Sequence, residues 1–199
     1  MVLLFHQGGG DVRGEYGPLI PWLLESGFDV VAVDQRLGGD RFGGTNRTAA
    51  RVAEKQYSYC DAYHDVEAAL DFSRKTFGVK PIVWGSSYSA ALVIKLAASR
   101  PNDVAGVLAF SPAGGEPMQG CDVSAYAADV KAPLLVLRQR REMEIPWIQA
   151  QNELLKTTGI SVYVPPNGTH GSSMLVPERV EGPVDEARQT VLRFLESVR

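Results

Sequence analysis

Short apolar runs and amphipathic segments alternate along this chain, and that alternation constrains its fold more than any other feature. Each apolar run stops at glycine, proline or a polar residue, as the buried strands of a parallel sheet do. Between the runs lie segments in which apolar side chains recur on one helical face. The expected strands cover residues 2–5, 28–33, 82–84, 104–110, 134–137 and 160–164, and the expected helices cover residues 18–25, 59–73, 88–99, 148–156 and 184–198.

Strands that alternate with helices predict parallel pairing through right-handed crossovers, with helices on both faces of the sheet. The 199 residues match the size of one domain, and no repeat, linker or change in composition marks a boundary. We therefore expect a single α/β domain over residues 1–199, with a mostly parallel, doubly wound sheet of about six strands.

Charge and composition exclude several classes of partner. The chain has 20 basic and 23 acidic residues and no long basic block, which argues against nucleic-acid binding. No apolar run is long enough to span a membrane, and the N-terminal apolar run ends too early for a signal peptide. We expect a cytoplasmic protein, or a secreted or periplasmic one if a leader has been removed.

Cys60 and Cys121 form no zinc-binding pattern. Buried thiols are expected, with a disulfide in an oxidising compartment as the alternative.

The segment Gly85-Ser86-Ser87-Tyr88-Ser89 follows an expected strand and opens an expected helix, which is the context of a G-x-S-x-G nucleophile elbow. Ser87 occupies the nucleophile position. Gly85 provides the small residue on one flank, and Ser89 replaces the usual second glycine. Because Ser also caps ordinary helices, a turn without a catalytic role is the alternative, and the motif needs partners.

A serine nucleophile needs a general base, and the three histidines are His6, His64 and His170. His64 lies in the middle of an expected helix, where a structural role is expected. His170 lies in a glycine-flanked loop after the last expected strand. In a parallel sheet this loop emerges at the same carboxyl edge as Ser87, so His170 is the expected base.

A carboxylate should orient the imidazole of the base. Glu142 follows the strand at residues 134–137 closely enough to turn over the carboxyl edge, and it is the expected partner. Glu144 is the second candidate, and a solvated charged loop in which neither acid is catalytic is the third interpretation.

The glycine-rich segment at residues 6–10 ends the first expected strand. Its backbone N–H groups could stabilise an oxyanion, because two preset donors are worth roughly 3 kcal/mol each at such a site. The N–H of Tyr88 together with that of Gly8 or Gln7 would form this oxyanion hole; a flexible glycine loop is the alternative. The segment is no dinucleotide-binding fingerprint, because Arg13 stands where the third glycine would be.

In these features the chain resembles the α/β-hydrolase superfamily, and in particular compact serine esterases and dienelactone hydrolases without a cap domain. The order of nucleophile, acid and histidine is that of the superfamily. The resemblance implies the triad Ser87, Glu142 and His170, oxyanion donors from Tyr88 with Gly8 or Gln7, and no metal or cofactor. It also implies that Asp34 and Arg36 form a structural turn pair, with a catalytic role as the alternative.

The chain departs from the superfamily pattern in several places. Two leading strands are missing, so residues 2–5 are expected to be partly uncovered. The insert at residues 111–133 is too short for a cap domain. It places Met118 at the rim of the site as a possible acyl contact, with a solvent-exposed methionine as the alternative. In a second rim loop, Arg41 and Arg47 could attract an anionic substrate, with solvated charge as the alternative.

These patterns predict a serine hydrolase that cleaves carboxylic esters of short or small acyl groups through an acyl-enzyme on Ser87. A thioesterase or a peptidase would use the same triad, and a binding protein would keep the pocket without turnover. The expected partner is a small-molecule ester, with no nucleic acid and no membrane, and the expected assembly is a monomer or a homodimer.

Overall fold

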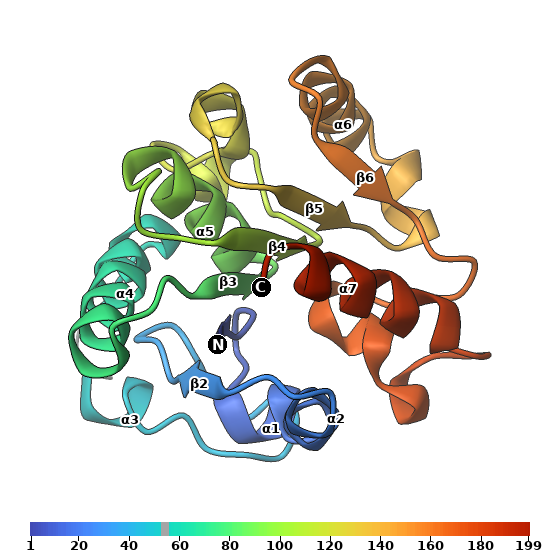
Figure 1. Cartoon of the computed structure of the whole chain (residues 1–199). Coiled ribbons are helices and arrows are strands. Elements are labelled where there is room, and N and C mark those ends of the chain that lie inside the picture. The colour runs from blue at the N-terminus through green and yellow to red at the C-terminus, as the bar shows by residue number, and fades with distance from the viewer. Residues whose placement is uncertain (53–55) are drawn as a thin grey trace.

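A computed structural model describes residues 1–52 and 56–199 of the chain. At its centre lies a six-stranded sheet in the order β2-β1-β3-β4-β5-β6, and all neighbouring strands are parallel (Figure 1). The predicted parallel α/β sheet is therefore confirmed. The strands are β1 (Val2–Phe5), β2 (Val30–Val33), β3 (Ile82–Ser86), β4 (Gly106–Phe110), β5 (Leu134–Leu137) and β6 (Ser161–Tyr163).

Helices cover both faces of this sheet, because side chains of each strand alternate between two cores. Leu3 and Phe5 of β1 face the core that contains α4 (Tyr63–Phe77) and α5 (Tyr88–Ser99). Val2 and Leu4 face the opposite core. That core contains side chains of α2 (Ile20–Glu25) and α7 (Asp185–Ser197), and Figure 1 shows these helices on the side of the sheet away from α4 and α5. The remaining helices are α1 (Val12–Tyr16), α3 (Ala49–Val52) and α6 (Pro146–Thr157).

The environment of β1 differs from the expectation that residues 2–5 would be partly uncovered. All four side chains of β1 are 0% exposed. The reason is that β2 pairs along the outer side of β1, so β2 forms the half-buried edge of the sheet in its place. The strand order also reverses at β1 and β3, which leaves a crevice outside their carboxyl ends where ligands of such sheets bind.

The connection from β4 to β5 contains only short 3-10 turns: Glu116–Met118, Val123–Ala125 and Ala127–Asp129. In the described residues no cap domain covers the carboxyl edge, as predicted. Met118, expected at the rim, is fully buried in the core beside α5, because its turn folds inward.

The expectation of two buried thiols is wrong, because Cys60 and Cys121 form a disulfide with their Cα atoms 5.6 Å apart. The bond ties the 3-10 turn Tyr59–Ala62 to the β4–β5 connection. These two segments lie far apart in the sequence and both border the carboxyl edge of the sheet. Of the chain that the structure covers, no helix is both long and apolar enough to cross a bilayer.

Candidate active site

Ser87 lies in the turn between β3 and α5 in a backbone conformation that is rare for serine. Its φ of 61° and ψ of −120° place it in the strained region typical of functional turns. Gly85 is required beside it, since a Cβ there would lie 2.4 Å from the carbonyl oxygen of Ser89. The hydroxyl of Ser89 lies 2.6 Å from the His6 carbonyl oxygen. The serine that replaces the usual glycine therefore fastens the start of α5 to the end of β1.

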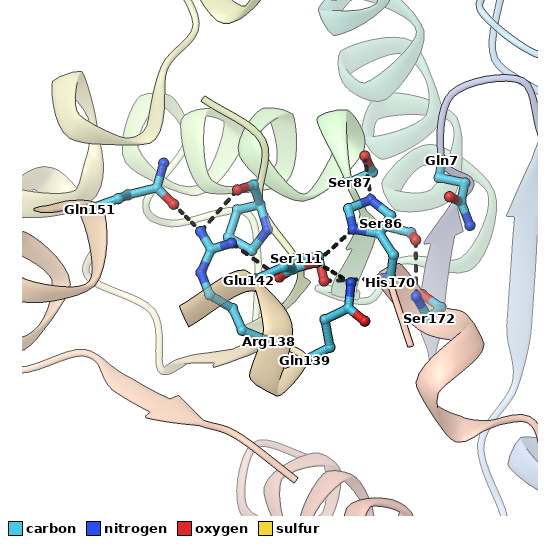
Figure 2. Close-up of polar contacts among 12 residues, drawn as sticks. Gln7, Ser86, Ser87, Ser111, Arg138, Gln139, Glu142, Gln151, His170 and Ser172 are labelled. Carbon is cyan, nitrogen blue, oxygen red and sulfur yellow. Dashed lines mark hydrogen bonds and ion pairs between the residues drawn. The ribbon is translucent and has the colours of Figure 1, made fainter. Parts of the chain in front are cut away.

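Three loops bring Ser87, His170 and Glu142 into one hydrogen-bonded chain at the carboxyl edge, as Figure 2 shows. The Ser87 hydroxyl lies 2.9 Å from His170 Nε2, and His170 Nδ1 lies 2.6 Å from Glu142 Oε1. This geometry suits a ring proton on Nδ1 that is donated to Glu142, with Nε2 free to accept the Ser87 proton. The other candidates lie elsewhere: Glu144 is exposed, and the largely exposed His64 contacts Glu67.

Glu142 is buried and held by several donors. Burial by itself raises the pKa of a carboxyl group, but the hydrogen bond and charge of His170, the Ser111 hydroxyl and the charge of Arg138 outweigh it. The pKa of Glu142 is therefore lowered from its ordinary value. Gln139 Nε2 also donates to its Oε1 at 3.2 Å. Glu142 thus remains an anion at neutral pH and can stabilise a positively charged imidazole.

Arg138 is a part of this site that the sequence did not reveal. Its side chain is 1% exposed, and its Nη1 lies 3.4 Å from Glu142 Oε2. The guanidinium also donates to Asn152 Oδ1 at 3.0 Å, to the Pro112 carbonyl oxygen at 2.9 Å and to Gln151 (Figure 2). Burial lowers the pKa of Arg138 to about 10, against the opposing effect of Glu142, so the group stays charged at neutral pH. A buried cation therefore lies directly behind the carboxylate.

The loop that carries His170 is anchored to the carboxyl ends of β3, which leads into Ser87, and of the neighbouring β4. The Gly171 N–H donates to Ser111 Oγ at 3.1 Å, and the Ser172 N–H donates to Ser86 Oγ at 3.0 Å. Gly171 has a φ of 68°, and a Cβ there would lie 2.4 Å from Ser86 Oγ, so no larger residue fits. The Trp84 indole N–H donates to Ser172 Oγ at 2.8 Å. These contacts fix the position of the imidazole relative to the elbow.

In the described part of the chain, two backbone N–H groups beyond the carboxyl ends of β1 and β3 have no acceptor. The Tyr88 N–H is the first of α5 and has no carbonyl one turn before it in the helix. The Gly8 N–H donates to no group among residues 1–52 and 56–199. In contrast, the Gln7 N–H donates to Glu15 Oε2 at 2.7 Å, so the alternative that placed Gln7 in the oxyanion hole is wrong. Gly8 and Tyr88 remain the pair that the structure leaves available.

Glu15 is the second side chain of the site that the sequence did not reveal. It is 0% exposed and lies behind the glycine-rich segment. Burial raises the pKa of Glu15 to about 7, against hydrogen bonds from Ser86 and Gln7 and the charge of Arg179. Its contact with the Gln7 N–H sets the path of the chain just before Gly8.

His6, Asp34 and Arg36 have structural roles. His6 is 0% exposed and accepts the Gln35 N–H at 2.9 Å, and burial lowers its pKa. Asp34 accepts the backbone N–H groups of Val12, at the start of α1, and of Arg47, and Arg36 forms an ion pair with Asp65 at 2.7 Å. The structural assignment of Asp34 and Arg36 is consistent with this geometry, although the two do not pair with each other.

An apolar cavity of about 340 Å³ borders His170 and Glu142. Tyr59 forms one wall and stacks on Tyr88 with ring centroids 4.8 Å apart. We call this cavity the apolar pocket; its apolar lining includes Tyr59, Pro112, Pro117, Ile145, Trp147 and Ile148. Over the described ranges, no group of three or more His, Cys, Asp or Glu side chains is arranged to hold a metal ion.

Solved structures share this fold. A monoacylglycerol lipase from Paleococcus ferrophilus superposes with a TM-score of 0.67 at 18% identity, covering 100% of this chain and 94% of the lipase. Est1E from Butyrivibrio proteoclasticus, solved with ferulic acid, superposes with a TM-score of 0.74 at 13% identity, covering 99% and 88%. An acylaminoacyl peptidase from Pyrococcus horikoshii superposes with a TM-score of 0.65 at 18% identity, covering 99% of this chain but 36% of the peptidase.

No curated protein matches the chain in sequence. Residues 1–166 match the family described as serine aminopeptidase, S33, a range that includes Ser87 and Glu142 and ends before His170. The resemblance to the α/β-hydrolase superfamily is confirmed by this match together with the fold. The chain therefore belongs to the serine aminopeptidase S33 family and is a serine hydrolase with the α/β-hydrolase fold.

Proposed function

We propose that this protein hydrolyses carboxylic esters of short or small acyl groups through an acyl-enzyme on Ser87. The observation that carries the proposal is the hydrogen-bonded chain from Ser87 through His170 to Glu142, which opens beside an apolar pocket. Each side chain then has one role: Ser87 is the nucleophile, His170 the general base and acid, and Glu142 the group that orients and stabilises the imidazole.

In the first half of the reaction, Ser87 Oγ attacks the ester carbonyl carbon while His170 Nε2 takes the hydroxyl proton. Negative charge develops on the carbonyl oxygen, where the N–H groups of Tyr88 and Gly8 would donate. His170 then passes its proton to the leaving alcohol, and the C–O bond to that alcohol breaks. In the second half, His170 removes a proton from water, and the resulting attack releases the acid and restores Ser87.

The size and lining of the apolar pocket support a small acyl group or one aromatic ring. A volume of about 340 Å³ falls at the lower end of ordinary ligand sites. Ile145 and Trp147 are 38% and 42% exposed, so the pocket is open to solvent on one side. A long acyl chain would extend past these residues into water and would gain little binding free energy there.

A peptidase is the second candidate, because the family description names a serine aminopeptidase. An aminopeptidase must bind the cationic α-amino group of its substrate, and an unpaired carboxylate is the usual partner for such a cation. The charged groups that line the two pockets bordering His170 are Glu142, which is already engaged by His170, and the cations Arg41, Arg138 and Arg179. This charge distribution supports an ester substrate over a peptide with a free amino terminus.

The test compares 4-nitrophenyl acetate, butyrate and octanoate in the parent and in Ser87→Ala, His170→Ala and His64→Ala variants. Far-UV circular dichroism and the melting temperature establish that each variant is folded. We expect hydrolysis that favours the shorter chains, is lost in Ser87→Ala and His170→Ala, and persists in His64→Ala, whose histidine is exposed on α4. Full activity in folded Ser87→Ala would overturn the proposal. An amino-acid 4-nitroanilide serves as the amide substrate, and its faster hydrolysis by the parent would select the peptidase.

A further inference from the structure

A second cavity borders His170 and differs in chemistry from the apolar pocket. It has a volume of about 220 Å³, and the residues that the argument uses are Gln7, Arg41, Phe42, His170 and Arg179. We call it the arginine pocket. His170 is the residue that the two linings share, so a substrate held at Ser87 could place one part in each pocket.

Two guanidinium groups face this cavity without a carboxylate partner. Arg41 is exposed, and it forms no ion pair within the described part of the chain. Arg179 is half-buried, with its guanidinium carbon 4.2 Å from the centre of the Phe42 ring. Two like charges that line one small cavity repel each other, and an anion between them would remove that cost.

Arg179 is held in place by neutral acceptors. Its Nη2 donates to the Gly14 carbonyl oxygen at 2.6 Å, and its Nη1 contacts the Glu15 carbonyl oxygen at 3.3 Å and Ser173 Oγ at 3.2 Å. These bonds orient the guanidinium, and none of them goes to a carboxylate. A guanidinium has five N–H donors, so donors remain for a ligand. Two carboxyl groups act on the charge of Arg179 without bonding to it, Glu15 and the exposed Glu178. Burial raises the pKa of Glu15 to about 7, so it is only partly ionised at neutral pH.

A carboxylate matches the geometry of arginine, because each guanidinium can donate two parallel hydrogen bonds to one carboxylate. We propose that the arginine pocket binds a carboxylate carried by the substrate, so that the preferred substrates are esters with an anionic group on one side of the scissile bond and an apolar group on the other. This inference rests on the proposed esterase function.

Two pairs of probes test it. In 3-acetoxybenzoate the carboxylate lies on the alcohol side of the ester, and in the mono-4-nitrophenyl ester of glutaric acid it lies on the acyl side. Each is compared with its carboxamide, which has a similar shape and no charge. We expect kcat/KM for the carboxylate to exceed that for the carboxamide by about tenfold in at least one pair at low salt, as expected for hydrogen bonds to a charged group. The ratio should fall toward one in Arg41→Gln and in 0.5 M NaCl.

Arg47→Gln is the matched control. Arg47 is an exposed arginine of the same loop as Arg41, and it is absent from the lining of the arginine pocket. The substitution retains its backbone N–H, which donates to Asp34. We expect the carboxylate preference to survive in this variant. An equal loss in Arg41→Gln and Arg47→Gln would overturn the inference, since it would indicate a general effect of positive charge.

A binding experiment separates this inference from the proposed function. The folded Ser87→Ala variant is titrated with intact 3-acetoxybenzoate, the mono-4-nitrophenyl glutarate and their carboxamides in a calorimeter. At least one carboxylate probe should bind more tightly than its carboxamide, and the double variant Ser87→Ala, Arg41→Gln should lose this difference. That result supports the arginine pocket even if the parent hydrolyses none of these esters. Equal affinity for the carboxylate and the carboxamide probe in both pairs overturns the inference. In that case, Ser87-dependent cleavage of the ester bond in the carboxamide probes would still leave the esterase proposal in place.

Discussion

Replacement of Glu15 by glutamine should stabilise the protein relative to the parent increasingly as the pH rises. Glu15 is 0% exposed, and burial raises its pKa from 4.5 to about 7. A carboxyl with a raised pKa binds its proton more tightly in the folded state than in the unfolded chain. Its contribution to the free energy of unfolding is therefore highest below about pH 4.5 and falls as the pH rises through about 7.

The size of this loss follows from the two pKa values. A rise from 4.5 to about 7 corresponds to about 3 kcal/mol in total, and most of it lies between pH 5 and pH 8. Glu15→Gln removes the titration but keeps an oxygen that can accept the Gln7 N–H. The difference in unfolding free energy, variant minus parent, should thus increase by about 2 to 3 kcal/mol from pH 5 to pH 8.

Urea denaturation at pH 5, 6, 7 and 8, followed by tryptophan fluorescence, measures this difference. The parent curve alone is insufficient, because burial lowers the pKa of His6 and makes its contribution change with pH in the opposite direction. His6 is present in both proteins, so its effect cancels in the difference. A difference that stays constant from pH 5 to pH 8 would refute the reasoning and would mean that Glu15 titrates near its ordinary value.

Three further predictions concern the site and its supports. Glu142→Gln should lower kcat about 1,000-fold or more, as loss of the imidazole-orienting anion does in other triads. Glu144→Gln should leave kcat unchanged, and steady-state kinetics on one ester measures both variants. Gly85→Ala should destabilise the fold by about 2 kcal/mol or more and lower kcat, because its Cβ would lie 2.4 Å from a backbone oxygen. An unchanged melting temperature would contradict the predicted loss of stability. Joint replacement of Cys60 and Cys121 by serine, which opens a loop with a sequence separation of 61, should cost about 4 kcal/mol, and chemical denaturation under non-reducing conditions measures it.

The fold was predictable because each strand and helix carries its own signal. The range predicted for β1, β5 and α5 equals the observed one. The helices α1 and α3 were missed, because they have five and four residues and are too short to show periodicity. The position of β2 outside β1 was also missed, since strand order depends on crossovers that no local pattern specifies.

The candidate site divides in the same way. Ser87, Glu142 and His170 lie in the loops that follow β3, β5 and β6. A parallel sheet gathers such loops at one edge, so the sequence indicated all three. The disulfide was judged wrongly, because 61 residues separate Cys60 from Cys121 and only the folded chain brings them together. Arg138 and Glu15 resemble ordinary surface residues in the sequence, since their burial depends on contacts with other parts of the folded chain, among them Pro112 for Arg138 and Ser86 for Glu15.

The serines around the elbow show why a motif search does not find the residues that support a catalytic site. The Ser172 N–H and Ser86 Oγ are 86 residues apart in sequence, and the Gly171 N–H and Ser111 Oγ are 60 apart. Neither partner is unusual by itself, yet together they fix the imidazole to within the hydrogen-bond distance that proton transfer requires. A motif specifies which atoms react, whereas the distances between them are set by pairs of residues on different strands. Substitutions at Ser86 or Ser111 should for that reason lower kcat while changing KM little, although neither side chain is a member of the proposed triad.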